Sequence, residues 1–392
     1  MEWKEVRLGE ISSKIGDGLH GTPKYDDEGP YYFINGNNLN CGKIIIKDDT
    51  KRVGKDEFVK NQKELNEQTI LVSINGTIGN VAKYNNELCI LGKSACYINV
   101  IKEVDKEFIY YVLTSANFKR NITNEATGTT IKNVSLKQMR EYKFNIPCNI
   151  SDQHRIASIL SSLDRKIELN NKINADFEEM AQAIFKNWFV DFEPFKDGKF
   201  VDSELGMIPE GWKVGGLFDI AEIFDKKRKP LSGNVREKMD KIYPYYGATS
   251  CMDYVDDYIF DGIYTLIGED GSVVKENGLP YMQYVWGKMW VNNHAHILQG
   301  KNGYSTEMIH ALLSITNIKF LVTGAVQAKL SQGNMQKILV AIPPKNVLDE
   351  IRPVIDNLYS KIRINTDENS RLSLLRDTLL PRLMSGELEV PE

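Results

Sequence analysis

The residues that decide the fold occur twice. Gly128–Pro147 reads GTTIKNVSLKQMREYKFNIP, and Gly324–Pro343 reads GAVQAKLSQGNMQKILVAIP. The two stretches align without a gap, and five of the twenty pairs are identical, where chance gives roughly one or two. The match extends outward on both sides, pairing Trp3, Leu8, Ile11, Ile156, Leu163, Lys166, Ile167 and Asn170 with Trp212, Leu217, Ile220, Ile351, Leu358, Lys361, Ile362 and Asn365. A repeat this long exceeds the roughly 20–50 residues of solenoid repeats, so the sequence predicts two copies of one module.

Composition limits the class of protein. At 392 residues the chain is long enough for two or three domains with their own cores. No apolar run approaches the length of about 18 residues that spans a membrane, and the charged start MEWKEVRLGE lacks the apolar core of a signal peptide. The five scattered cysteines without CxxC spacing are typical of reduced thiols. We therefore expect a cytoplasmic protein that does not enter a membrane.

The charge of the chain is unevenly distributed. Its formal net charge is −4, which argues against a protein that coats nucleic acid with its whole surface. The long helical segments carry an acidic excess, whereas the two modules are near neutral and contain local basic clusters. A DNA reader with this composition holds phosphates through local patches.

Each module reads as short strands and turns. In the first, the strand signals are Tyr31–Ile34, Thr69–Ile74, Val81–Tyr84 and Ala95–Ile98, and Phe108–Phe118 reads as a short helix. In the second, they are Tyr243–Tyr246, Tyr264–Ile267 and Ala295–Leu298. Glycines at the turns separate these strands in both copies.

A long helix follows each module. Gln153 to Asp191 contains no Gly or Pro, and apolar residues recur there at steps of three and four, at Ile156, Ile159, Leu163, Ile167, Ile173, Phe177, Met180 and Ile184. The pattern predicts one helix of about 37 residues, capped by Ser151 or Asp152. A similar stripe, which predicts the partner helix, consists of Ile351, Val354, Leu358, Ile362, Leu372, Leu375 and Leu379.

The ends of the second helix are set by prolines. Pro353 is tolerated only near a first turn, so Asp349 is predicted as the cap, and Pro381 and Gly386 as the end. A helix this long cannot bury its stripe in a small domain, so the two helices are predicted to pack against each other. Asn170 and Asn365 fall near this seam, where a buried Asn fixes register, although a solvated flank is the alternative.

Three stretches resemble the specificity (S) subunit of type I restriction-modification enzymes. The first comprises QHRIA at 153–157 and FKNWFVDF at 185–192. The second is ELGMIPEGW at 204–212, which enters the second module, and the third is LLPRLMSGEL at 379–388. The resemblance covers the full length of the chain and includes its duplication.

The resemblance implies a DNA-reading role. Each module would be a target-recognition domain that reads one half of a split sequence in double-stranded DNA, and the helices would be an antiparallel spacer. The subunit would have no catalytic activity and bind no cofactor itself. It would dock two modification subunits, which methylate adenine with S-adenosylmethionine, and restriction subunits, which use ATP and Mg to translocate and cleave DNA.

The predicted fold class is therefore α+β with pseudo-two-fold symmetry. Two mixed α/β target-recognition domains occupy 1–149 and 212–345. The spacer helices form a coiled coil from 150–191 and from 346–392, the latter including a C-terminal tail, and 192–211 is a linker.

Candidate DNA contacts lie in basic or Gly-rich loops, because cations hold phosphates, Asn, Thr and Ser read base edges, and Gly lets the backbone approach. In the first module they are Gly18, His20, Thr22, Lys24, Asn35, Asn37, Asn38, Thr77, Thr129, Thr130 and Lys132. In the second they are Lys226, Lys227, Arg228, Lys229, Tyr246, Gly247, Thr249, Ser250, Ser272, Gln327 and Lys329. For each loop, an ordinary solvated turn is the alternative.

No metal or catalytic site is predicted. His294 and His296 would share a strand face, but the first module has Ser94 and Cys96 there, and no acidic residue or Cys lies at ligand spacing. The run 92–94 is not a phosphate-binding loop, since the required Gly at position 87 is Glu. The chain also lacks a GxGxxG run and the Asn-Pro-Pro-aromatic run of adenine methyltransferases. A coiled-coil adaptor that binds proteins, without DNA specificity, is the alternative function.

Overall fold

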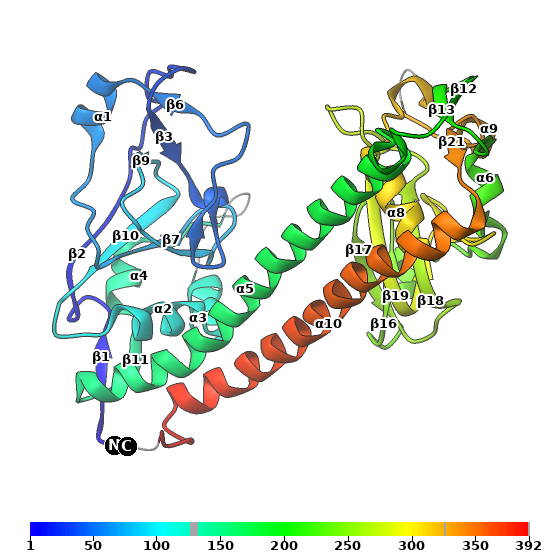
Figure 1. The fold of residues 1–392 in the computed structure, drawn as a ribbon. Helices are drawn as coiled ribbons and strands as arrows, with labels where there is room; N and C mark the ends of the chain where they lie inside the picture. The colour runs from blue at the N-terminus through cyan, green and yellow to red at the C-terminus, as the bar shows by residue number, and fades with distance from the viewer. Residues whose placement is uncertain (126–131, 325–326, 391–392) are drawn as a thin grey trace. The chain divides into compact units, whose positions relative to one another are not determined.

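The computed structural model describes residues 1–125, 132–324 and 327–390 (Figure 1). Its contacts divide the chain into unit 1, residues 1–168 and 368–392, and unit 2, residues 169–367. Each unit contains one repeated module and parts of both long helices. The predicted domain borders at 149, 191, 211 and 345 stay predictions, because the compact units divide within the helices.

Unit 1 is built on short strands. An antiparallel sheet has the order β2 (Ser12–Asp17), β10 (Ala95–Val100), β7 (Thr69–Ser73) and β8 (Val81–Lys83). A second sheet has the order β6 (Arg52–Val53), β3 (Tyr31–Ile34) and β9 (Cys89–Leu91), with β3 and β9 parallel. Two further pairs are β1 (Trp3–Arg7) with β11 (Lys143–Pro147) and β4 (Leu39–Asn40) with β5 (Lys43–Ile44). Its short helices are η1 (Gly36–Asn38), α1 (Lys55–Asn61), α2 (Lys106–Thr114), α3 (Ala116–Glu125) and α4 (Leu136–Glu141).

Unit 2 contains one larger sheet. Its order is β15 (Ala221–Ile223), β20 (Ala295–Gly300), β18 (Phe260–Gly268), β19 (Met282–Val291), β16 (Tyr243–Tyr246) and β17 (Cys251–Val255). Two further pairs are β14 (Lys213–Gly216) with β21 (Leu339–Ile342) and β12 (Phe200–Ser203) with β13 (Gly206–Pro209). The short helices are η2 (Glu193–Phe195), α6 (Leu217–Ile220), η3 (Asp225–Lys227), α7 (Gly233–Arg236), α8 (Thr306–Ile315), η4 (Lys319–Leu321) and α9 (Gln332–Met335).

The strand order confirms the duplication. Among the described residues, each module has a single parallel strand pair, β3 with β9 and β16 with β19. The long strand β19 takes the place of β8 and β9 together, so both modules have the same order of strands. A backbone N–H after that parallel pair makes the same bond twice, from Gly92 to the carbonyl of Ile34 (2.8 Å) and from Asn292 to that of Tyr246 (3.0 Å).

The strand predictions are close to the structure. The stretches Tyr31–Ile34 and Tyr243–Tyr246 are β3 and β16 with the same ends, and the other predicted strands differ from β7, β8, β10, β18 and β20 by at most four residues at either end. The predicted short helix at Phe108–Phe118 is instead two helices, α2 and α3, because the chain leaves the helical conformation at Ser115.

The long helices α5 (Ile150–Phe189) and α10 (Lys345–Met384) have 40 residues each. At a rise of 1.5 Å per residue, each is about 60 Å long. The predicted caps of both helices were wrong. The Asn149 side chain accepts the Ser151 N–H (2.9 Å), so α5 begins earlier than a Ser151 or Asp152 cap allows.

Prolines do not bound α10 as predicted. The helix begins at Lys345, before Asp349, and contains Pro353 in its interior. There Pro353 has no N–H to donate to the Asp349 carbonyl, so one hydrogen bond of the helix is missing. The helix also passes through Pro381, and the chain turns at Gly386, where φ is +75°.

The two helices are antiparallel within each unit. In unit 1, Arg376 Nη1 lies 2.7 Å from Asp164 Oδ1. In unit 2, Asn365 donates to Asn174 Oδ1 (2.9 Å), and Asn170 is buried. Asn365 thus lies in the seam as predicted, and the solvated alternative is excluded for Asn170.

The buried stripes differ in detail from the prediction. Met180, Val354 and Leu375 are 45–49% exposed. Ile355 and Tyr359 are fully buried in the core of unit 2 instead. Steps of three and four define a stripe only to within one residue, and packing against the module selects the neighbour. Among the described residues, no helix combines the length and apolarity needed to cross a membrane.

Candidate nucleic-acid interface

The register of unit 1 brings its polar loops to one end of a sheet. Asp17, at the end of β2, lies opposite Cys96, and Ser73, at the end of β7, lies opposite Ala95. The chain therefore leaves β2 and β7 at the same end at which it enters β10. The parallel strands β3 and β9 also lead there, which adds the loops that follow Ile34 and Leu91.

Hydrogen bonds fix these loops around one turn, residues 92–94, which we call the central turn of unit 1. Ser94 accepts from the Gly36 N–H through Oγ and from the Ile74 N–H through its carbonyl. Neighbouring bonds run from the Leu19 N–H to the Leu91 carbonyl and from the Val134 N–H to the Ile74 carbonyl. Segments beginning near residues 17, 34, 74, 92 and 132 thus form one frame.

A cleft of about 240 Å³ opens beside this frame. Its polar lining comes from four segments and consists of Asp17, His20, Asn75, Lys93, Asn133 and Ser135. Hydrogen-bond donors and acceptors of several kinds therefore converge on one concave surface. Such a lining is suited to reading the polar edges of bases.

Unit 2 repeats the backbone bonds that join three segments of the frame. The Glu269 N–H donates to the His294 carbonyl (2.8 Å), and the Leu330 N–H donates to the Glu269 carbonyl (2.8 Å). The bridge between Asn75 and Asn133 in unit 1 recurs between Asp270 and Lys329. Residues 292–294 are therefore the central turn of unit 2.

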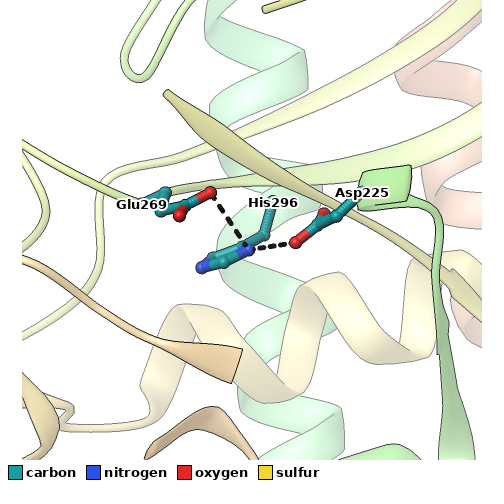
Figure 2. Close-up of side chains that lie close together, drawn as sticks. All are labelled: Asp225, Glu269 and His296. Atoms are coloured by element: carbon teal, nitrogen blue, oxygen red, sulfur yellow. Dashed lines mark hydrogen bonds and ion pairs between the residues drawn. The ribbon is translucent and has the colours of Figure 1, made fainter. Parts of the chain in front are cut away.

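A buried ion-pair network underlies the frame of unit 2, and Figure 2 shows three of its members. His296 Nδ1 lies 2.5 Å from Asp225 Oδ2 and 3.7 Å from Glu269 Oε2. Arg228 Nη1 lies 2.6 Å from Glu269 Oε2 and donates to the Ala295 carbonyl (2.8 Å). Gln332 also donates to Asp225 (2.7 Å). The network thus links the basic loop, two turns and the start of α9.

The electrostatics of the network favour ionised Asp225. Burial by itself raises the pKa of this carboxyl group. The hydrogen bond and charge of His296, the charge of Arg228 and the Gln332 amide act in the opposite direction, and together they hold the pKa below its usual value. Asp225 therefore acts as a buried anion among cationic and amide donors.

Asp225, Glu269 and His296 also have the geometry of metal ligands, with ligand atoms within 4.8 Å of one another. Sequence spacing gave no sign of this group, because its members come from three distant segments. However, Arg228 already contacts both carboxylates, and His296 Nε2 contacts the Leu330 carbonyl (2.7 Å). We therefore interpret the group as a structural network in which Arg228 supplies the positive charge.

The structure brings the described contact residues predicted for unit 1 together in the segments of the frame, of which His20 lines the cleft itself. Asn35 is half-buried, and its side chain accepts from Ser94 Oγ (2.9 Å). Thr129 and Thr130 lie outside the described residues. The exposed ones are His20, Thr22, Lys24, Asn37, Thr77 and Lys132.

Gly18 and Asn38 are buried, so the structure corrects their predicted role. A Cβ on Gly18 would lie 2.0 Å from the Leu91 carbonyl oxygen, so this glycine permits close packing inside the protein. The Asn38 side chain accepts the Asn35 N–H and donates to the Ile45 carbonyl (both 3.0 Å). Both residues support the frame from within.

In unit 2 the predicted residues also gather at the frame. Tyr246 is half-buried, and Gly247 is buried against Met252, whose Sδ a Cβ would approach to 2.3 Å, so Gly247 has a packing role. Arg228, with a side chain only 12% exposed, positions the loop. The exposed ones are Lys226, Lys227, Lys229, Thr249, Ser250, Ser272, Gln327 and Lys329.

The two central turns were missed as sites by sequence reasoning. The sequence of residues 92–94 suggests only an incomplete phosphate-binding motif, and that of residues 294–296 only a pair of histidine ligands. In the sequence each turn shows only a polar residue, Lys93 or Asn293, between apolar strands, and that pattern does not by itself mark a site.

Comparisons with known proteins agree with this fold. The family model described as "Type I restriction modification DNA specificity domain" matches residues 1–179 and 209–374. The type I restriction enzyme MjaIX specificity subunit of Methanocaldococcus jannaschii is 27% identical, over 95% of this chain and 87% of its own length. The HindI specificity subunit of Haemophilus influenzae is 24% identical, over 72% and 77%.

A solved structure shows the same fold. The crystal structure of the type I restriction-modification system S subunit from M. genitalium matches with a TM-score of 0.55 at 20% identity, covering 98% of this chain and 96% of that one. The family match covers most of the chain and falls into two parts, as does the structural duplication. The chain therefore belongs to the type I restriction modification DNA specificity domain family.

Proposed function

We propose that this chain is the non-catalytic DNA-reading subunit of a type I restriction-modification assembly. Each unit reads one half of a bipartite site through the loops around its central turn. The observation that carries the proposal is the frame itself, whose backbone bonds between the central turn and two neighbouring segments recur in both units and whose exposed polar side chains differ between them. To read two different half-sites, two domains need the same backbone scaffold and different exposed side chains on its loops.

The charge pattern supports DNA as the ligand. Exposed lysines stand in the bordering segments of both frames, among them Lys24, Lys93 and Lys132 in unit 1 and Lys226 and Lys229 in unit 2. Such local cations hold phosphates even though the chain as a whole is acidic. Relatives over most of the chain are named as specificity subunits of restriction enzymes.

In this proposal, partner subunits catalyse the methylation and the cleavage of DNA. Two modification subunits methylate adenine with S-adenosylmethionine, and restriction subunits use ATP and Mg for translocation and cleavage. The long helices set the gap between the half-sites and dock the modification subunits. Because the substrate is cellular DNA, we place the assembly in the cytoplasm.

Selection from random duplexes tests the proposal. The full chain, with its modification subunit, is incubated with a randomised DNA library at moderate salt, and the bound duplexes are sequenced. We expect an enriched motif of two short halves separated by a fixed gap. Binding without sequence preference would contradict the proposal, and salt-independent affinity for a protein ligand without affinity for DNA would favour the adaptor alternative.

An insertion tests the spacer separately. Four residues added to α5 after Lys172 and four added to α10 after Asp367 lengthen each helix by about 6 Å. The gap in the selected motif should grow by about two base pairs, at 3.4 Å per pair. As a control, the same four residues inserted at Leu205, in the exposed turn between β12 and β13, should leave the gap unchanged. An unchanged gap in the helix variant with intact binding would show that the helices do not set the distance.

A further inference from the structure

One exposed residue occupies the middle of each central turn. In unit 1 it is Lys93 and in unit 2 it is Asn293, and both follow the residue that bonds back to the parallel strand. Lys93 lines the cleft together with polar side chains from three other segments. The side chain at this position makes no bond that stabilises the frame, so it has no structural role there.

The backbone on both sides of this position is fixed. A Cβ on Gly92 would lie 2.2 Å from Asn35 Oδ1, and Ser94 is held by Asn35 and by the Gly36 N–H. In unit 2, Arg228 donates to the carbonyls of Asn293 (3.3 Å) and Ala295 (2.8 Å). The residue is thus presented from a rigid turn, which limits the entropy lost when its side chain binds a ligand.

The side chain itself is unengaged, in contrast with its neighbours. His20 is paired with Asp17 (2.7 Å), and His294 is paired with Asp270 (2.5 Å). Within the described parts of the chain, neither the Lys93 ammonium group nor the Asn293 side-chain amide has a hydrogen-bond or ion-pair partner. An unpaired polar group on a fixed turn at the centre of a polar site is placed to bind an external ligand.

We propose that residue 93 in unit 1 and residue 293 in unit 2 determine base preference, each at one position of its half-site. This inference rests on the proposed DNA-reading function. Lys93 offers only donors and therefore selects guanine, whose major-groove edge carries the acceptors N7 and O6. Asn293 offers a donor and an acceptor and therefore selects adenine, through N6 and N7.

Reciprocal substitution tests the assignment. The full chain with its modification subunit is prepared as wild type, Lys93→Asn and Asn293→Lys, and each form selects from the same random library. Lys93→Asn should change one guanine of one half-site towards adenine, and Asn293→Lys should change one adenine of the other half-site towards guanine. The preference at the altered position should shift by roughly tenfold or more, as expected for a contact to a base edge.

The outcomes separate base reading from other roles. Lys93→Arg should retain guanine, since Arg reaches the same acceptors. A uniform loss of affinity with an unchanged motif would assign the position to phosphate contact and overturn the proposal. An unchanged motif with unchanged affinity would also overturn it. So would a change by both variants in the same half-site. If wild type selects no split motif, the proposed function itself fails, which is a different result.

A matched variant controls for loss of a surface charge. Lys60 on α1 is exposed and does not line the cleft. Lys60→Asn should leave both the motif and the affinity unchanged. A shift of the motif in this control would mean that charge removal anywhere alters selection, and the assignment to residue 93 would be withdrawn.

Discussion

The two units hold the same loop frame by different chemistry. In unit 1 the central turn is held by neutral bonds between Ser94 and Asn35 and by the close packing that Gly18 and Gly92 allow. In unit 2 the corresponding turn is held by a largely buried ionic network, in which Arg228 and His296 each contact Asp225 and Glu269. The same backbone can therefore be fixed with or without ions. The difference should appear when one charge is removed or when the pH is lowered.

Arg228→Met should have the largest effect. Removing this cation leaves half-buried Glu269 without its guanidinium partner and takes one positive charge from buried Asp225. Breaking a buried pair costs about 3–5 kcal/mol. Hydrogen exchange of the full chain should show this loss in peptides covering residues 292–298, and the half-site read by unit 2 should be lost from the selected motif.

The equivalent position in unit 1 provides the control. His20 lies three residues after Asp17, as Arg228 lies three residues after Asp225, but the His20 side chain is 72% exposed. His20→Met should change the free energy of local opening by less than about 0.5 kcal/mol, as is usual for surface substitutions. Equal effects of the two substitutions would show that the network of unit 2 does not hold its frame.

His310 gives unit 2 a second sensitivity, to acid. This residue of α8 is buried, and burial, assisted by the charge of Lys275, lowers its pKa to about 4. Between pH 6.5 and about 4 the unfolded chain binds a proton that the folded unit does not, so stability falls as the pH decreases through this window. The full difference is about 3 kcal/mol, from 1.36 kcal/mol for each pKa unit.

Comparison with α2 sharpens this prediction. Tyr110 lies five residues after the cap of α2, as His310 does after that of α8, and burial raises the pKa of Tyr110. This tyrosine stays neutral throughout the same window. In hydrogen exchange at pH 7 and pH 4.5, His310→Gln should remove most of the loss that is specific to residues 306–315. If the pH dependence of wild type and variant coincide, His310 is not its source.

The features that could be predicted from the sequence are those set by interactions between residues close together in the chain. The duplication and the strand Tyr31–Ile34 follow from local patterns, and both are confirmed. The central turns could not be predicted, because Gly92 becomes central only when β9 pairs with β3, which lies far away in the sequence. The Asp225 network likewise joins separate segments that no spacing rule relates. Met180 and Val354 were misplaced because a helical stripe tolerates a shift of one residue.

Gly18→Ala in unit 1 should have the smallest effect on local stability, and Gly21→Ala in the same loop is its control. In Gly18→Ala, the new methyl group would lie 2.0 Å from the Leu91 carbonyl oxygen, so the loop must move away from the central turn. Such overpacking costs about 1–3 kcal/mol. Gly21→Ala, three residues later, meets no atom within 4 Å and should cost almost nothing. In unit 2 the loop after β15 forms η3 (Asp225–Lys227) instead, and each of its residues carries a side chain. Faster hydrogen exchange in residues 89–95 of Gly18→Ala only, with residues 289–295 unchanged, would therefore show that the two frames are held by separate means. Equal exchange in Gly18→Ala and Gly21→Ala would contradict the role assigned to Gly18.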